Sequence, residues 1–192
     1  MLFIVSARKP NMNLSNHFLI AMPDMRDPFF SGSVVYVCDY SDEGATGVVI
    51  NKPSPLPVRK VLESMQHRVP PYFAEGYVLV GGPVQTDRGF LLHTPAGSWK
   101  SSLAVNNEIA LTSSDDILAH LEDEAQVHKA LLFMGYSGWS PGQLEQELAD
   151  NSWLTVPADL GIVFDLPHEA RYDAAIKLLN IVPEQLGAGG HA

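Results

Sequence analysis

The sequence predicts an α+β fold, with a mixed, largely antiparallel sheet and flanking helices. Strand-like segments and turn residues dominate the first half of the chain, and helices are added mainly in the second half. Strand and helix therefore do not alternate regularly, as they do in doubly wound parallel sheets. The 192 residues are 46% hydrophobic and 18% charged, which is typical of a globular protein with a proper core.

The first half is expected to hold most of the strands. Three segments near its start are rich in Val, Ile, Phe and Tyr and are separated by turn residues: 17–22, 33–40 and 46–51. We expect the last two to form a hairpin. Apolar residues then recur at helical spacing from Val58 to Met65, which predicts one helix with a buried face. Strands at 77–80 and 89–94 and a hairpin across Asn106-Asn107 complete this half.

The second half adds helices between further strands. Ser113 followed by Asp116 resembles a capping box and predicts a short helix that reaches Ala125. Buried strands are expected at 130–134 and 161–164, and the last helix at 167–180.

A well-specified helix start is expected at Ser140. Serine is a good N-cap, Pro141 suits the first helical position, and Gln143 has the right spacing to reach back to the cap. Trp139 precedes this cap and is expected to pack on Leu144 as a hydrophobic staple. The alternative is that Trp139 is exposed and anchors a partner.

We expect a single domain over residues 12–188, because no repeat or long linker divides the chain. Residues 1–11 are interpreted as a loose N-terminal extension and residues 189–192 as a frayed tail. The sequence has no run of about 20 apolar residues and no recognisable secretory signal, so we expect a cytoplasmic protein that does not enter the membrane. A single cysteine, Cys38, excludes an intramolecular disulfide and fits a reducing compartment.

The charge balance argues against direct contact with nucleic acid. The chain has 12 Lys and Arg against 22 Asp and Glu, a formal net charge of -10. Such a chain repels phosphate backbones instead of releasing their counterions. The densest basic segment, Arg59-Lys60 with Arg68, is interpreted as the solvated side of a helix.

The histidines give no sign of a metal site. None of the 7 has metal-ligand spacing with another histidine, with Cys38 or with a nearby carboxylate, and we expect neither a metal nor a cofactor. His93 ends an expected strand and is placed near Asn51 and Lys52 of a neighbouring loop. It is a candidate pocket residue, although a structural histidine is the commoner case.

Two glycine-rich segments each follow an apolar, strand-like run: Gly81-Gly82-Pro83-Val84 and Gly135-Tyr136-Ser137-Gly138-Trp139. The first has two interpretations, a backbone cradle for an anion or a structural reversal between two strands. Pro83 removes one amide donor. Neither the lysine of a phosphate-binding loop nor the spacing of a dinucleotide fingerprint is present, so we favour the structural reversal.

Several motifs together resemble those of the bacterial YqgE/AlgH family. They are Ala21-Met22-Pro23, Asp27-Pro28, Gly44-Ala45, the run from Gly47 to Pro53, the two glycine-rich segments, Leu92-His93 and Gln143-Leu144-Glu145. The resemblance covers roughly residues 14–188, which is far more specific than one short pattern. It implies a compact cytosolic α+β domain whose sheet is bent into a pseudo-barrel, and no settled activity. Some family members carry the label of a transcriptional regulator.

Ser137 departs from the family pattern, in which alanine is usual at this position. A serine in a sharp glycine turn between strand and helix resembles a nucleophile elbow, and Asp165 and His168 follow in hydrolase order. The elbow, however, needs glycine two residues after the serine, and Trp139 stands there. We therefore favour a structural turn over a serine hydrolase.

These observations favour a non-enzymatic binding or regulatory protein that acts through a pocket or a protein interface near the glycine-rich segments. The candidate residues are Asn51, Gly81, Gly82, Pro83, His93, Tyr136, Ser137 and Trp139. Its partner is expected to be a small molecule or another protein. The alternatives are a small hydrolase whose site is assembled only in three dimensions and, more weakly, a transcriptional regulator that contacts DNA. Convergence of Asn51, His93 and Ser137 in one concave site would indicate where the function lies.

Overall fold

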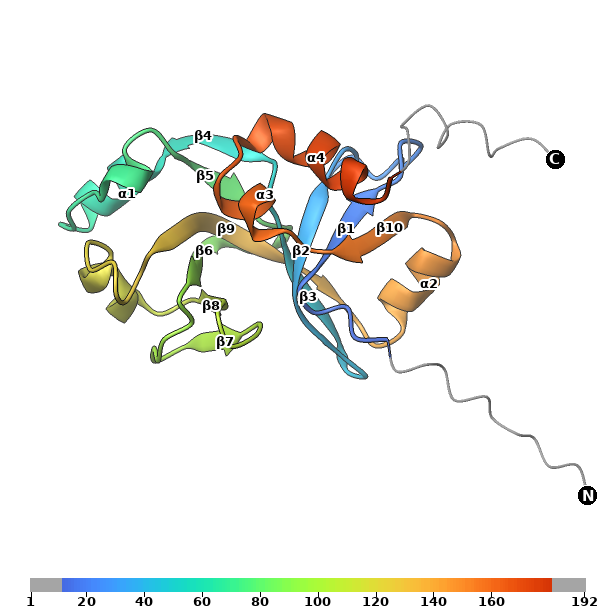
Figure 1. Ribbon diagram of the computed structural model, residues 1–192, viewed down its shortest axis with the longest axis horizontal. Coiled ribbons are helices and arrows are strands. Elements are labelled where there is room, and N and C mark those ends of the chain that lie inside the picture. The colour runs from blue at the N-terminus through green and yellow to red at the C-terminus, as the bar shows by residue number, and fades with distance from the viewer. Residues whose placement is uncertain (1–11, 181–192) are drawn as a thin grey trace, which may run out of the picture.

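The structure is a computed structural model that describes residues 12–180 (Figure 1). The expected extension at residues 1–11 and the tail at 189–192 lie outside the described residues. The strands are β1 (His17–Ala21), β2 (Val34–Ser41), β3 (Gly44–Val49), β4 (Pro53–Pro57), β5 (Tyr77–Val80), β6 (Val84–Thr94), β7 (Ser102–Ala104), β8 (Ala110–Thr112), β9 (Lys129–Trp139) and β10 (Trp153–Pro157). The helices are α1 (Val58–Ser64), α2 (Gln143–Ala149), α3 (Leu160–Phe164) and α4 (Arg171–Leu178), with 3₁₀ turns η1 (Pro71–Phe73), η2 (Asp115–His120) and η3 (His168–Ala170).

The strands form one curled sheet organised around β9, which crosses the centre of the molecule in Figure 1. The strand order is β10-β1-β2-β3-β9-β6-β8-β7, and β4 joins through β5. Only β5 and β9 pair in parallel, whereas every other pair in the described chain is antiparallel. Short connections between consecutive strands favour antiparallel pairing. The expected α+β fold with a mixed, largely antiparallel sheet is confirmed.

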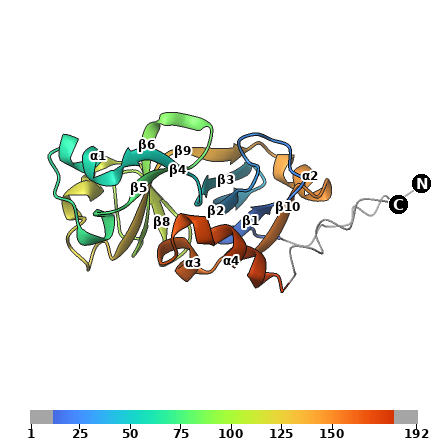
Figure 2. The ribbon, with the colours of Figure 1, turned by 90° about the horizontal axis from the view of Figure 1, so that it is seen from above.

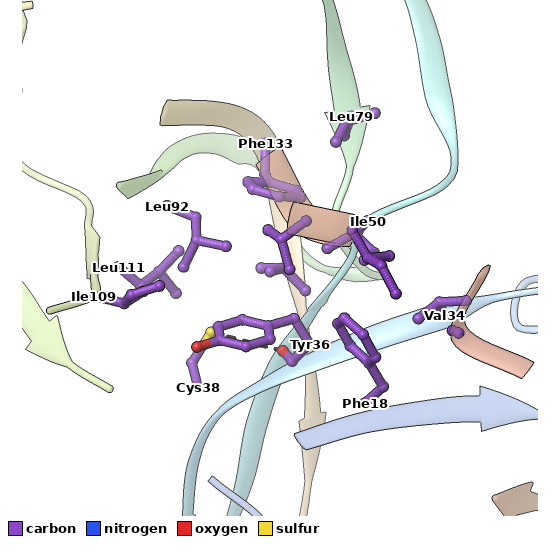
Figure 3. Close-up of a cluster of buried hydrophobic side chains, with 14 of the residues drawn as sticks. Phe18, Val34, Tyr36, Cys38, Ile50, Leu79, Leu92, Ile109, Leu111 and Phe133 are labelled. Atoms are coloured by element: carbon purple, nitrogen blue, oxygen red, sulfur yellow. Dashed lines mark hydrogen bonds between the residues drawn. The ribbon is translucent and has the colours of Figure 1, made fainter. Parts of the chain in front are cut away.

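Alternation along β1 and β2 divides the interior into two layers. Phe18 and Tyr36 face α3 and α4, whereas Leu19 and Val35 face α2, because successive side chains of a strand point to opposite faces. Figure 2 shows α2 on one side of these strands and α3 with α4 on the other. In the layer under α3 and α4, Phe18, Tyr36 and Phe133 point toward one another (Figure 3).

A third apolar cluster lies at the opposite end of the molecule from β10, under α1 (Figures 1 and 2). Val58 and Leu62, two of the residues with helical spacing, are buried in it, whereas Met65 remains 45% exposed. The predicted helix is therefore confirmed, but its buried face is narrower than expected. The hairpins β2–β3 and β7–β8 also form as expected.

Residues 161–164, expected as a strand, are the helix α3 instead. Asp159 caps this helix, because its Oδ1 accepts a hydrogen bond from the amide of Gly161 at 2.8 Å. A short apolar run fits a buried strand and a buried helix turn equally well, so its length did not decide between them. The strand that precedes it, β10, pairs along β1 and was not expected.

Two other helix predictions were partly wrong. The segment after Ser113 forms only the 3₁₀ turn η2, and Ser114 Oγ donates to Asp116 Oδ1 at 2.5 Å instead of capping a helix. The expected helix at 167–180 is divided into η3 and α4, although Ala175 and Ile176 are buried on its inner side as predicted. The strand β4 was also missed, because its three prolines argue against a central strand and it lies at a sheet edge.

Candidate functional site

The second glycine-rich segment was expected to form a turn, and this prediction is wrong because the segment is part of a strand. Gly135 to Trp139 form the end of β9, where Ser137 lies opposite Gly47 of β3. Gly135 has a φ of 72°, a conformation that glycine adopts without strain. Glycine in a strand often marks a bend or a close approach of another backbone segment. The glycines of this segment permit both inside the sheet.

The first glycine-rich segment crosses over β9 at this bend. It links β5 on one edge of β9 to β6 on the other edge. A Cβ atom added to Gly82 would lie 2.0 Å from the carbonyl carbon of Tyr136, and one added to Gly81 would lie 2.4 Å from the Gly135 oxygen. The amide of Gly81 donates to Met134 O at 3.0 Å. This geometry fits a structural reversal between strands, since the Gly81 amide already donates a hydrogen bond inside the protein.

Asn51 and Ser137 both lie close to this crossing and both bond to backbone. Ser137 is fully buried, and its Oγ donates to Gly81 O at 3.0 Å. Asn51 Oδ1 accepts from the Val34 amide at 2.9 Å, and its Nδ2 donates to Gly32 O at 2.8 Å. Both side chains tie together segments that are far apart in sequence.

His93 lies elsewhere, because it pairs with Ala130, seven residues along β9 from Ser137. It is fully buried, with Nδ1 2.9 Å from Pro95 O and Nε2 2.7 Å from Thr112 Oγ1. A carbonyl oxygen only accepts, so Nδ1 carries the proton and Thr112 donates to Nε2. Burial lowers the pKa of His93. The structure therefore does not bring Asn51, His93 and Ser137 into one concave site.

Trp139 is a core residue with only 6% of its surface exposed, and it shares a buried cluster with Leu144. Its indole N–H donates to Glu147 Oε2 at 2.9 Å, and the indole of Trp153 donates to the same oxygen at 2.8 Å. This burial agrees with the staple and not with an exposed anchor. The expected cap is shifted: Gln143 Oε1 does accept from the Ser140 amide at 3.0 Å, but the helix begins only at Gln143.

Tyr136, the remaining candidate of this segment, lines a pocket of about 310 Å³. The pocket is enclosed by β3, β6, β9 and the β7–β8 hairpin. Its lining residues are Thr46, Gln85, Phe90, Ser101, Ser102, Leu103, Leu111, Ser113 and Tyr136. Phe90 and Tyr136 meet edge to face, with ring centroids 5.5 Å apart, and give the pocket an aromatic wall. We call it the Arg88 pocket, after the cation that contacts two of its lining residues, Phe90 and Ser113.

Arg88 does not line this pocket, but it is a cation beside it. Its guanidinium carbon lies 5.9 Å from the centroid of the Phe90 ring, and Nη2 donates to Ser113 Oγ at 3.1 Å. Ser113 Oγ lies 2.9 Å from Ser101 Oγ. Within residues 12–180, no carboxylate lies within 4.0 Å of Arg88, whereas Arg59 and Arg68 both have acidic neighbours. An exposed guanidinium beside hydroxyl groups and an aromatic wall is suited to a carboxylate or a phosphate.

Sequence reasoning missed Arg88, Ser101 and Ser113. The alternation of Arg88 and Phe90 along β6 places both on one face, and this signal was available. The approach of Phe90 to Tyr136 and of Arg88 to Ser113 could not be predicted, because it depends on the pairing of β6 with β9 and with β8.

Other reactive groups are buried or isolated. Cys38 is buried, and desolvation raises the pKa of its thiol far above the ordinary value, which keeps it protonated. The described residues contain no group of three His, Cys, Asp or Glu side chains that could hold a metal ion. Among the helices that the structure describes, none is long and apolar enough to cross a membrane.

Comparison with known proteins gives consistent matches over almost the whole chain. The profile of the AlgH-like family matches residues 18–184. A UPF0301 protein of Neisseria meningitidis serogroup C is 54% identical over 182 residues, which cover 94% of this chain and 100% of that protein. A UPF0301 protein of Chromobacterium violaceum is 50% identical over 184 residues, covering 95% and 99% of the two chains.

Two solved structures share the fold. The solution structure of the AlgH protein from Pseudomonas aeruginosa is 43% identical, with a TM-score of 0.75 and coverage of 96% of this chain and 99% of that one. A protein from Corynebacterium diphtheriae, 22% identical over 81% of each chain, has a TM-score of 0.61 and supports the fold alone. The family match and the curated relatives confirm the resemblance carried by the glycine-rich segments, and this chain belongs to the AlgH-like (YqgE/AlgH) family.

Proposed function

We propose that this chain is a non-enzymatic binding protein of the cytoplasm that takes a small organic anion in the Arg88 pocket and acts as a regulator through that ligand. The observation that carries the proposal is the Arg88 guanidinium, which has no carboxylate partner in the described chain and contacts Phe90 and Ser113, two lining residues of a concave, partly aromatic site. Ligand sites typically combine an apolar wall with a few convergent polar groups, in volumes from about 300 Å³ upward.

Each part of the pocket has a role toward such a ligand. The guanidinium attracts the anionic group and offers it two parallel N–H donors. The hydroxyl groups of Ser101 and Ser113 supply further hydrogen bonds. Phe90 and Tyr136 provide a flat surface for an apolar or planar part of the ligand.

The alternative function, hydrolysis, has less support from the serine and histidine that it would need. Ser137 is fully buried and donates its proton to a backbone carbonyl, so it is neither accessible nor paired with a base. His93 would have to become charged to act as a general base for an acyl transfer. Its burial opposes this charge, as the lowered pKa of the ring indicates.

The test is a titration of ¹⁵N-labelled protein with benzoate and with its neutral analogue benzamide, followed by NMR. We expect benzoate to shift the amide signals of Gln85, Ser101 and Ser113, and benzamide to bind much more weakly. The variant Arg88→Gln should bind benzoate at least about tenfold more weakly, a loss of about 1.4 kcal/mol.

Arg59→Gln is the matched control, because it removes the same charge from an exposed site on α1. It should leave benzoate binding unchanged. Equal affinities of wild-type protein and Arg88→Gln for benzoate, or benzoate shifts confined to other surfaces, would rule the proposal out.

A further inference from the structure

A second cavity, of about 300 Å³, lies between α1, η2 and the sheet. Figure 1 shows α1 at the end of the molecule away from β10. The apolar wall of the cavity includes Val61 and Met65 from α1, Leu118 from η2, and Leu91 and Met134 from the sheet. Leu91 and Phe90 are neighbours on β6 and belong to different clusters on opposite faces. Phe90 and Ser113 line both this cavity and the Arg88 pocket, so the two adjoin, but most of the apolar wall of the cavity comes from Leu91 and its cluster.

The apolar side chains around this cavity are incompletely buried by the described chain. Met65 is 45% exposed, and Val61, Leu118 and Met134 are only partly buried, although the last three pack against the third cluster. Bringing such surface out of water is favourable in proportion to its area. Two of the four are methionines, whose unbranched and polarizable side chains adapt to occupants of different shape.

The volume indicates the size of the occupant. A dry apolar cavity of about 150 Å³ holds one benzene ring, so twice that volume accommodates about ten carbon atoms. An α-helix with its side chains is about 10–12 Å across and is too large for this space. A small molecule fits the cavity better than a peptide helix does.

The charge at the rim indicates the chemistry of the occupant. Asp115 lines the cavity, and no lysine or arginine does. The hydroxyl groups of Ser113 and Ser114 are already bonded, to Arg88 and Asp116 respectively. A carboxylate brought to this rim would lie beside the like charge of Asp115, and Arg88, which is bonded to Ser113, does not itself line the cavity. A neutral molecule meets no like charge.

We propose that the apolar cavity between α1 and η2 binds a neutral, largely apolar small molecule of about ten carbon atoms. This site adjoins the Arg88 pocket at Phe90 and Ser113, but its other lining residues differ and so does its preferred charge. The two proposals are tested separately, because the benzoate experiment depends on Arg88 and the 1-octanol experiment reads Met65 and Met134.

The experiment compares 1-octanol with octanoate, which share a chain length and differ in charge. Methionine methyl groups labelled with ¹³C report the site directly, since Met65 and Met134 line the cavity and Met25 packs in the second cluster near α2. We expect 1-octanol to shift the Met65 and Met134 signals with saturation and to leave Met25 unchanged. Octanoate should bind at least about tenfold more weakly, a difference of about 1.4 kcal/mol.

Two variants separate cavity binding from surface association. Val61→Phe fills part of the cavity and should reduce 1-octanol affinity at least about tenfold, whereas the exposed Lys60→Gln on the same helix should not. Asp115→Asn removes the rim charge at an exposed position. It should strengthen octanoate binding several-fold and leave 1-octanol binding unchanged.

The proposal is overturned if 1-octanol shifts neither Met65 nor Met134, or shifts all three methionines alike. It is also overturned if octanoate binds wild-type protein as tightly as 1-octanol does. Should Val61→Phe fail to fold, the Asp115→Asn comparison decides: unchanged discrimination between octanol and octanoate would count against the proposal.

Discussion

His93 shows how one polar side chain is accommodated in the core by a specific proton arrangement. The Pro95 carbonyl accepts from Nδ1, and the Thr112 hydroxyl donates to Nε2, while Ser102 Oγ lies 2.9 Å from Thr112 Oγ1. The neutral ring satisfies every partner. Desolvation lowers the pKa of His93, and the hydrogen bond to Pro95 offsets this only partly. A charged ring would also require the two hydroxyl groups to reverse direction.

This arrangement predicts a pH-dependent stability that His93→Gln removes. The unfolded chain has an ordinary histidine pKa of about 6.5 and takes up a proton more readily than the folded chain does. The stability that His93 contributes is therefore complete above this pH and is lost as the pH falls toward the lowered pKa. Between about pH 7.5 and 5, the urea midpoint of wild-type protein should fall more than that of His93→Gln.

His128→Gln is the control, because His128 is exposed. It should keep the wild-type dependence on pH. Asp116 and Asp123 also have lowered pKa values, but their contributions are lost only below the ordinary carboxyl value of 3.8, outside this window. An identical pH dependence of wild-type protein and His93→Gln would contradict the assigned proton arrangement.

At the scale of elements, β9 holds the two halves of the sheet together. It pairs with β3 near its end, with β5 in its middle and with β6 along its other edge. The connection from β5 to β6 must pass over this strand at close range, which is why two glycines occur there. The Gly81-Gly82 pair is thus explained by the crossing of strands.

Gly82→Ala should therefore destabilise the protein strongly. Its Cβ would lie 2.0 Å from the backbone carbon of Tyr136, so the crossing must move and strain the pairing of β9. We expect a loss of about 3 kcal/mol in the free energy of unfolding, measured by chemical denaturation.

Gly76→Ala provides the comparison, because the atoms nearest to its added Cβ lie 3.8 Å away or more. This change should shift the free energy of unfolding by less than about 1 kcal/mol. Equal stabilities of the two variants would show that the crossing is looser than the structure has it.

At the scale of the whole molecule, the charge distribution limits the kinds of partner that we expect. The net charge is -10, and the basic residues Arg59 and Arg68 have carboxylates at 3.4 and 4.0 Å. Arg59 and Arg68, the residues of the densest basic segment that these carboxylates contact, therefore do not offer an unpaired basic surface. Any regulatory effect is expected to pass through a small ligand or a protein partner.

Purified protein should accordingly show no salt-sensitive binding to duplex DNA. Fluorescence anisotropy of a labelled duplex should remain unchanged at about 50 mM and 150 mM salt, because too few phosphate contacts are available to release counterions. Tight binding at low salt that weakens steeply at the higher concentration would refute this expectation.

The amino-acid sequence by itself determined the fold class, most strands and the family. Segments rich in Val, Ile, Phe and Tyr between turn residues predicted β1, β2 and β3, and helical spacing predicted α1, because both signals are local. The order of motifs identified the AlgH-like family, since each motif is short but their combination is specific.

Only the tertiary structure decided what the glycine-rich segments do and where the pockets lie. Gly135 to Trp139 has the composition of a turn, yet the pairing of β9 with β3 makes it a strand. The apolar composition of α3 fits a strand, but the residues form a helix that Asp159 caps. Phe90 meets Tyr136 only because β6 and β9 pair in the sheet. Long-range register and close backbone approach leave no local pattern, and this is why the two pockets could not be predicted from sequence.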